Sequence, residues 1–281
     1  MYFKDRNLYM EISGSENDEK SRKKEYQLIL IDALKKEIGI ARRLDPEKLA
    51  VEIEKTGFCC HYCGKCCRRA FGDNTVALTP QEIEKIRKYT GNSKTEVAGP
   101  LIPDAFQPEE ENGEKREKKE TSSDLSKASG IEEISPGSAR IFELLKEDID
   151  SEGNIHTYGW MLRRKRSGDC NFLEKGSNRC SIYPVRPMLC STYPFYIEGL
   201  KLYTCECEGL GDHISAEESR KLAESLISRY ILELEDTLAV YEKYEDFERT
   251  ERGQEIARKN LEKRVCIYII HDCEGITKII E

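Results

Sequence analysis

Cysteines supply the most distinctive chemistry in this sequence. Residues 58–71 read FCCHYCGKCCRRAF, and within them Cys60, Cys63 and Cys66 follow one another at three-residue intervals, with Cys67 directly after. A C-x2-C step allows two thiolates to converge on one metal centre, and three ligands in a row at this step match the run that wraps a four-iron cluster. Mononuclear zinc usually takes two ligands from each of two such knuckles. The spacing therefore predicts a thiolate-bound metal and favours iron over zinc alone.

The adjacent pair Cys66-Cys67 restricts how the metal can be bound. Neighbouring residues rarely present both side chains to one tetrahedral ion without strain. We therefore expect one of the two to serve a second centre, to bridge two metals, or to remain unbound. A second region of the chain adds four thiolates at Cys170, Cys180, Cys190 and Cys207. The total permits two four-ligand sites, or one cluster and one further ion.

The other cysteines and the histidines are weaker candidates. These cysteines are Cys59, Cys205, Cys266 and Cys273. They are either spare ligands or small buried side chains, and we favour burial for Cys266 and Cys273. His61 lies in a loop already rich in thiolate, so we expect it to flank the ligands and not to bind metal. The histidines without a partner at a metal-binding spacing are His156, His213 and His271.

Basic residues accompany both cysteine regions. Residues 58–71 carry a net charge of +3 and residues 163–190 carry +5, although the whole chain carries −8. Positive charge beside thiolates lowers their pKa and offsets the negative charge of a thiolate-bound centre. The candidates for this role are Arg68, Arg69, Arg179 and Arg186. For the run Arg163, Arg164, Lys165 and Arg166, a solvated basic surface is an equally good interpretation.

The overall composition excludes some classes of protein. The chain has 281 residues, of which 38% are hydrophobic and 35% charged. Its net negative charge argues against a protein that coats nucleic acid, because such proteins neutralise phosphates with excess Lys and Arg. It has no apolar run of 18 residues and begins without the apolar segment of a signal peptide, so we expect a cytoplasmic protein with no membrane contact. In that compartment the 12 cysteines indicate metal or redox chemistry and not a disulfide framework.

Helices are predicted on both sides of the cysteine regions. Residues 1–57 form an N-terminal helical segment, in which Asp45-Pro46 caps and begins a short second helix. Thr79, Pro80 and Glu82 provide a capping box for a helix that ends at Gly91. A second capping box, formed by Ser215 and Glu218, begins a long helix with apolar residues every three or four positions.

Short strands are predicted between and after these helices. We expect a strand over residues 157–163 and a hairpin in YPFYIEGLKLYTC that turns at Glu198-Gly199. The closing residues predict two strands around a turn from Asp272 to Gly275.

Together these elements predict an α+β protein whose cysteine-rich metal-binding core of small strands is flanked by N-terminal and C-terminal helices. The cysteine-cluster domain is expected over residues 58–212. Within it, 14 of the 29 residues from 107 to 135 are charged, so this segment is predicted to be a flexible insertion. Residues 213–281 are expected to supply a long helix and a strand hairpin that pack on the core.

The cysteines and their neighbours resemble the YkgJ-like cysteine-cluster (CxxCxxCC) family, a zinc- or iron-chelating domain. Beyond the first run, the resemblance rests on DCNFL at 169–173, RCSIY at 179–183, Arg186-Pro187, Tyr193-Pro194-Phe195 and CEGLG at 207–211. It covers roughly residues 58–91 and 157–212. The resemblance implies eight metal ligands: Cys60, Cys63, Cys66, Cys67, Cys170, Cys180, Cys190 and Cys207.

The function expected first is metal binding through these eight cysteines, with iron, as an iron–sulfur cluster, favoured and zinc as the alternative. Such a protein would act with a redox partner protein or on a protein substrate. A purely structural zinc module is a second interpretation, because a thiolate site can add about 10 kcal/mol to the stability of a loop-rich fold. A branch of the same family also suggests a lysine N-methylase-like enzyme that uses S-adenosylmethionine, although the sequence has no glycine-rich nucleotide loop. A nucleic-acid-binding module that uses the basic residues of 58–71 and 163–190 is the least favoured function.

Overall fold

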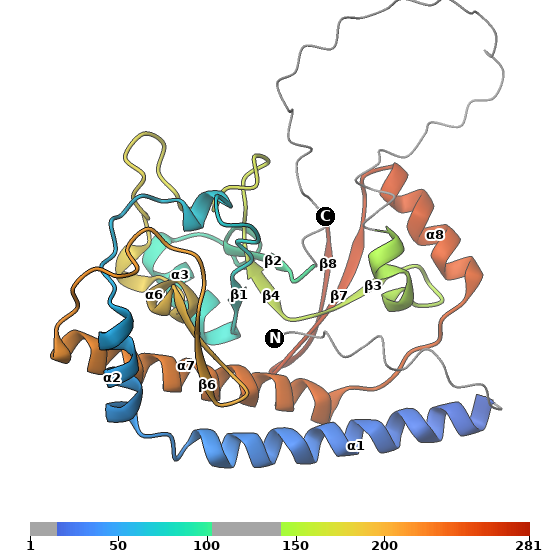
Figure 1. Ribbon diagram of the computed structural model, residues 1–281. Coiled ribbons are helices and arrows are strands. Elements are labelled where there is room, and N and C mark those ends of the chain that lie inside the picture. The colour runs from blue at the N-terminus through green and yellow to red at the C-terminus, as the bar shows by residue number, and fades with distance from the viewer. Residues whose placement is uncertain (1–15, 103–141) are drawn as a thin grey trace, which may run out of the picture. The chain divides into compact units, whose positions relative to one another are not determined.

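The computed structural model describes residues 16–102 and 142–281 (Figure 1). The predicted insertion at 107–135 lies outside these residues. The α-helices are α1 (Glu16–Ala41), α2 (Pro46–Thr56), α3 (Pro80–Thr90), α4 (Lys94–Val97), α6 (Met188–Thr192), α7 (Ala216–Lys243) and α8 (Glu251–Glu262). The strands are β1 (Ala77–Leu78), β2 (Ala98–Pro100), β3 (Ile155–Tyr158), β4 (Trp160–Leu162), β5 (Phe195–Glu198), β6 (Lys201–Thr204), β7 (Ile267–Asp272) and β8 (Gly275–Ile280). The described residues also contain the 3-10 turns η2 (Cys66–Arg68), η3 (Lys146–Asp148) and η4 (Tyr183–Val185).

The predicted α+β class, with small sheets and helices on both sides of the cysteine-rich region, is confirmed. The sheets have the strand orders β1-β4-β2, β3-β7-β8 and β5-β6. The chain divides into two compact units: Met1–Leu101, Tyr158–Glu245 and Ile270–Thr277 form the first, and Ile102–Thr157, Asp246–Ile269 and Lys278–Glu281 form the second. All eight predicted ligands belong to the first unit. The division into segments 1–57, 58–212 and 213–281 stays a prediction.

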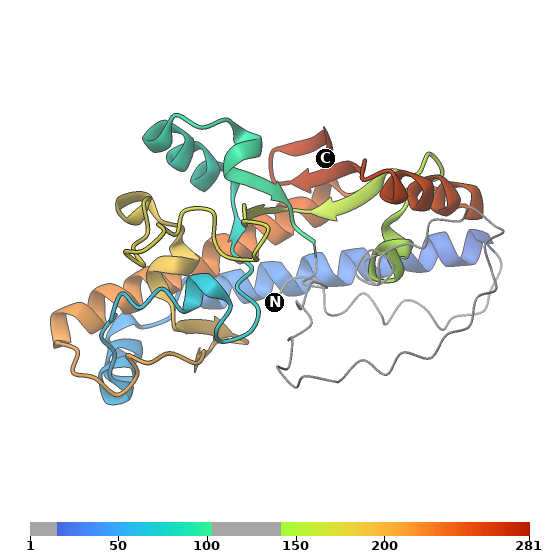
Figure 2. The same cartoon turned by 90° about the horizontal axis from the view of Figure 1, so that it is seen from above.

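Three helices form the main core of the first unit. Helix α1 runs alongside α7 in both views (Figures 1 and 2), where Lys35 Nζ lies 2.7 Å from Glu242 Oε1. Helix α2 begins as predicted, because the Asp45 side chain accepts the Glu47 N–H and Pro46 occupies the first turn. The buried core that these helices share with the β5-β6 hairpin contains Ala41, Ala50, Ile53, Phe195, Ile197, Ile214, Ala223, Leu226 and Tyr230.

The predicted capping boxes are both present. The Thr79 hydroxyl accepts the Glu82 N–H at the start of α3, and Gly91 ends that helix with a φ of 77°. Ser215 and Glu218 form the same reciprocal bonds at the start of α7. The first side chain of each pair satisfies a backbone donor that would otherwise have no partner inside the helix.

The strands differ in detail from the predicted ones. The strand expected over 157–163 is divided at Gly159, whose φ of 109° suits glycine, so β3 ends before it and β4 begins after it. In the β5-β6 hairpin Glu198 pairs with Lys201, so the turn residues are Gly199 and Leu200, one position later than expected. The final turn, between Asp272 and Gly275, is confirmed.

The second unit is organised around the start of α8. Thr250 caps this helix. Gly253 in its first turn packs against the backbone of Asp150, so closely that an added Cβ would lie 2.0 Å from the Asp150 carbonyl oxygen. His156 stacks on Phe247 with ring centroids 3.7 Å apart, and its Nε2 lies 3.2 Å from Asp150 Oδ2. These contacts account for the burial of His156, which has no predicted metal role.

Of the helices described in the two ranges, none combines the length and apolar character needed to cross a membrane.

Replacement of Leu226 by Ala tests the α1–α2–α7 core. Leu226 is 1% exposed, so the change should leave a cavity and lower the free energy of unfolding by about 2–5 kcal/mol. Urea denaturation followed by circular dichroism measures this. Ser225→Ala is the matched control, because that exposed side chain bonds only to the Lys221 carbonyl of its own helix. Equal stability of the two variants would contradict the assigned core.

Candidate metal centre

The first cysteine run is fixed at its start by contact with the segment around residue 210. The bridge between Phe58 and Leu210 pairs the two segments in antiparallel fashion. The Cys59 N–H donates to the Gly209 oxygen at 3.0 Å, and the Gly211 N–H donates to the Gly57 oxygen at 3.1 Å. We call this pairing of residues 57–59 with 209–211 the loop clamp. It brings Cys207 to the beginning of the cysteine run.

Glycine is required on both sides of the loop clamp. A Cβ at Gly209 would lie 1.9 Å from the Cys59 oxygen, and one at Gly57 would lie 2.5 Å from the Asp212 oxygen. Either side chain would therefore force the segments apart. The backbone contact explains why the segment CEGLG at 207–211 has a glycine, Gly209, two residues after Cys207.

Two side-chain pairs cross between the same segments. The Lys65 ammonium donates to the Glu208 carboxylate, and His61 Nε2 lies 2.5 Å from Asp212 Oδ2. All four side chains are more than two-fifths exposed, so each pair stabilises the loop only weakly. The contact with Asp212 agrees with the expectation that His61 flanks the ligands.

The end of the run contacts the second cysteine region. Cys66 and Cys67 lie in η2, and the Cys67 oxygen accepts the Cys170 N–H at 2.9 Å. Cys180 in turn lies in an antiparallel bridge with Leu173, three residues beyond Cys170. The backbone therefore places Cys170 and Cys180 on adjoining segments next to η2.

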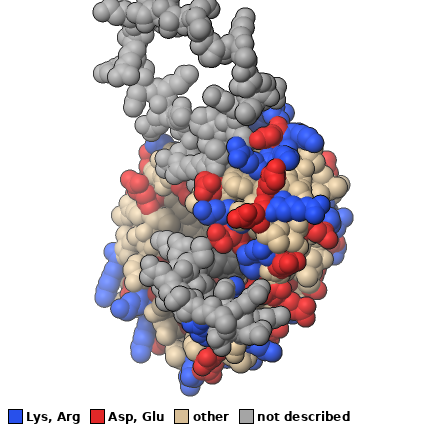
Figure 3. All heavy atoms as spheres, turned by 90° about the vertical axis from the view of Figure 1, so that its right-hand side faces the viewer, with Lys and Arg blue, Asp and Glu red and all other residues tan. Residues whose placement is uncertain are grey.

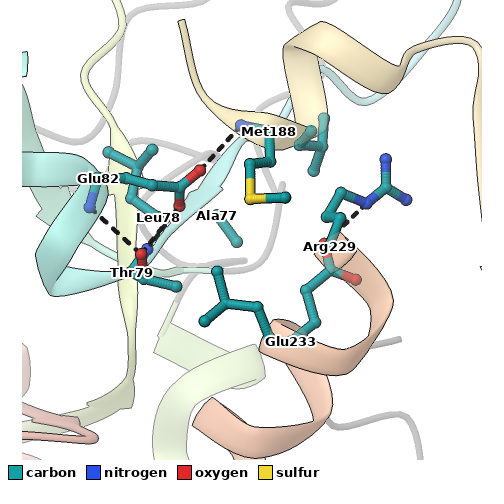
Figure 4. Close-up of a pocket in the computed structure, with 9 residues that line it drawn as sticks. Ala77, Leu78, Thr79, Glu82, Met188, Arg229 and Glu233 are labelled. Carbon is teal, nitrogen blue, oxygen red and sulfur yellow. Dashed lines mark hydrogen bonds and ion pairs between the residues drawn. The ribbon is translucent and has the colours of Figure 1, made fainter. Parts of the chain in front are cut away.

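Cys190 lies on α6, and other elements hold both ends of this short helix. At its start, Glu82 Oε1 of α3 accepts the Met188 N–H at 2.8 Å, while Glu82 Oε2 accepts the Thr79 N–H (Figure 4). At its end, the buried Arg229 of α7 donates to the Thr192 hydroxyl. Figure 4 shows Glu82, Met188, Arg229 and Glu233 around a small pocket beside this helix. Cys190 is thus attached to a helix that α3 and α7 position together.

The adjacent thiols of Cys66 and Cys67 influence each other strongly. Their sulfurs are 4.0 Å apart. The hydrogen bond from Cys67 lowers the pKa of Cys66 to about 7, and the same bond raises the pKa of Cys67 well above its usual range. The pair therefore favours loss of one proton, from Cys66, and opposes loss of the second. A metal that removes both protons would replace this hydrogen bond.

The predicted ligands form two sets around Cys66. The first thiol set contains Cys60, Cys63 and Cys207, and the second thiol set contains Cys67, Cys170, Cys180 and Cys190. Burial raises the pKa of Cys207, and the charges of Cys66, Cys63 and Cys60 raise it further. Burial also raises the pKa of Cys190, with further increases from Cys170, Cys66 and Cys180. The two cysteine regions meet at η2, where the Cys67 oxygen accepts the Cys170 N–H.

The cysteine side chains do not form a coordination shell in this structure. Within residues 16–102 and 142–281, no three Cys, His, Asp or Glu side chains converge closely enough to hold a metal ion. All 12 cysteines lie in these ranges and are free thiols. The chemistry of the donor set, made of soft thiolates, suits iron or zinc.

Comparison with known families now identifies the domain. Residues 59–224 match the family model CxxCxxCC, "Putative zinc- or iron-chelating domain", over more than half of the chain. The chain belongs to this family. The CxxCxxCC match includes all eight predicted ligands and confirms the resemblance expected from the sequence. Neither the curated proteins nor the solved structures contain a significant match.

Most of the basic run beside the CxxCxxCC cysteines binds protein oxygens. Arg163 Nε donates to the Thr95 oxygen at 2.7 Å, Arg164 contacts Asp73 and Thr75, and Lys165 donates to the Leu173 oxygen. These side chains hold loops together, a role that neither sequence interpretation included. The face shown in Figure 3 carries Lys and Arg intermixed with Asp and Glu.

The sequence did not reveal two further side-chain contacts. The rings of Tyr62 and Tyr183 pack at a tilted angle with centroids 5.6 Å apart, although 121 positions separate them. Cys273, expected to be a small buried residue, is partly exposed; burial and a hydrogen bond with Asp236 raise its pKa to about 12. Cys266 is buried as expected. Tyr62 adopts a positive φ of 53°, which no residue pattern around it predicts. Both contacts join residues far apart in the chain, so no spacing in the sequence indicates them.

Replacement of Gly209 by Ala tests the loop clamp. The added methyl group would overlap the Cys59 oxygen, so we expect the free energy of unfolding to fall by about 1–3 kcal/mol and metal content to fall with it. Thermal unfolding and metal analysis of the purified chain measure both effects. Gly39→Ala is the control, because nothing lies within 4 Å of a Cβ there. A Gly209→Ala protein with full stability and metal content would exclude a tight clamp.

Proposed function

We propose that the eight cysteines bind iron as an iron–sulfur cluster, with zinc as the alternative metal. The ligands in this proposal are Cys60, Cys63, Cys66, Cys67, Cys170, Cys180, Cys190 and Cys207. The observation that carries it is the junction of the two cysteine regions at η2, where the Cys67 oxygen accepts the Cys170 N–H at 2.9 Å and the Cys66 and Cys67 sulfurs are 4.0 Å apart. Two independent zinc sites would need two separate groups of four thiolates. The adjacent thiols at this junction favour a centre with several metal atoms that both regions share.

The protein contributes an enclosing scaffold and positive charge to this centre. The loop clamp holds Cys60 and Cys207, and α6 holds Cys190. When bound, an iron–sulfur cluster supplies one-electron transfer. Cys60 and Cys66 are exposed residues, which supports access to the centre by a redox partner protein. Free thiolate ligands also require a reducing compartment, which supports a cytoplasmic location.

Metal and sulfide analysis tests the identity of the centre. The full chain, purified without oxygen, should contain iron and acid-labile sulfide and should absorb broadly near about 400 nm, as thiolate-bound clusters do. Zinc without sulfide in a colourless protein would replace the iron proposal by a structural or Lewis-acidic zinc centre. A chain that retains neither metal would overturn metal binding altogether.

Serine substitutions test whether Cys66 joins the two thiol sets. Cys66→Ser should release more metal per chain than Cys63→Ser or Cys180→Ser, because those two residues each belong to one set. Metal and sulfide per chain provide the measurement, and circular dichroism checks that each variant is folded. Cys266→Ala is the control, since this buried cysteine lies outside both sets. Equal losses from all three serine variants would argue against a shared ligand.

A further inference from the structure

Helix α1 carries apolar side chains on two sides, and α7 covers one of them. On the α7 side, Gln27 donates to the Tyr241 oxygen at 2.5 Å, and Ile38 is buried. The Tyr230 hydroxyl of α7 donates to the Glu37 carboxylate of α1. These contacts fix which side of α1 faces α7 and therefore which side is turned away from it.

The side of α1 turned away from α7 exposes large apolar residues. Leu28, Ile29 and Ile40 are 59%, 58% and 43% exposed. Ile29 and Ile40 are 11 residues apart, about three helical turns, so they lie on one line along the helix, and Leu28 adjoins this line. A helix with a single packing partner keeps polar residues on its other side. The exposed apolar line on α1 therefore indicates a second partner.

Charged residues lie along the same line in a regular order. Glu25 and Asp32 occupy the first half of the line, and Lys36 and Arg43 occupy the second half. All four are exposed. Arg43 directly follows α1, in a turn whose N–H bonds to the Ile40 oxygen at 2.9 Å. One end of the line is thus acidic and the other is basic. The α1 stripe is defined as Glu25, Leu28, Ile29, Asp32, Lys36, Ile40 and Arg43.

This order of charges makes the α1 stripe complementary to a second copy of itself. About a two-fold axis at the level of residue 34, Glu25 of one copy would lie opposite Arg43 of the other. Asp32 would lie opposite Lys36, to which it is already paired within its own chain at 2.6 Å. The same axis would bring the apolar ends of the line together. In a parallel pair each charge would face its own copy, and like charges would repel.

The composition of the α1 stripe favours a protein partner over a membrane. Helices that lie on anionic membranes carry excess Lys and Arg beside their apolar face. The α1 stripe instead has two acidic and two basic residues. A closed two-fold contact uses the same surface on both copies, which is what the order of charges provides.

We propose that the α1 stripe is a homodimer interface, in which α1 packs in antiparallel orientation against α1 of a second copy of this chain. The interface goes beyond the proposed metal centre and does not depend on it, because the α1 stripe contains no cysteine.

Sedimentation velocity of the full chain in a reducing buffer tests the dimer. The reducing agent prevents disulfide links between the exposed cysteines. The unmodified chain should sediment with twice its mass of 32.4 kDa. Ile29→Glu should weaken association at least about 100-fold, because it places an unpaired charge in the interface. Val51→Glu is the matched control: Val51 is an apolar residue of α2, 49% exposed and outside the α1 stripe, so this variant should remain dimeric.

A charge exchange tests the antiparallel direction. Glu25→Arg should weaken the dimer about tenfold, because the two-fold axis places each new arginine opposite Arg43 of the other copy. The double variant Glu25→Arg with Arg43→Glu should restore association. The two residues are 18 positions apart, about 27 Å along one helix, so the restoring contact can come only from a second copy. Circular dichroism checks that each variant is folded.

Three outcomes would contradict the proposal. An unmodified chain that stays monomeric at every concentration would overturn the interface. A dimer that Ile29→Glu leaves intact would show that another surface forms the contact. A dimer that the double variant fails to restore would overturn the antiparallel arrangement.

Discussion

The metal centre depends on one close approach between two backbone segments. Residues 57–59 and 209–211 lie against each other without an intervening side chain, and this contact is possible because Gly209 has no Cβ. Without it, Cys207 would be separated from the first cysteine run, and only the side-chain pairs Lys65–Glu208 and His61–Asp212 would connect these loops. Such exposed pairs contribute little by themselves. The backbone contact therefore has the larger part in holding the first thiol set.

Cys190 of the second thiol set depends instead on helix ends. Glu82 belongs to the capping box of α3 and also accepts the first N–H of α6, so one carboxylate couples the two helices. Arg229 of the long α7 holds the other end of α6 through Thr192. A short helix of five residues has little stability alone, because helix nucleation is costly. The contacts of α6 with α3 and α7 therefore determine the position of Cys190.

The sequence predicts local structure well where the relevant contacts are local. Asp45, Thr79 and Ser215 act within three residues of their partners, so their caps could be identified from spacing. The cysteine intervals also carry the family pattern that the match over residues 59–224 confirms, whereas the eight ligands themselves stay a prediction. The hairpin turn was misplaced by one residue because Leu200 takes a positive φ that its side chain does not predict. The contact between the Tyr62 and Tyr183 rings and the loop-binding role of Arg163 join distant residues, for which one sequence provides no spacing rule.

The loop clamp also has a consequence during protein synthesis. Cys67 and Cys207 are 140 positions apart, so the first cysteine run leaves the ribosome well before its partner segment exists. At 5–20 residues per second this interval is about 7–28 s. Throughout it, the first cysteine run exists without the segment that pairs with its start. The loop clamp can form only after residues 207–211 have been synthesised.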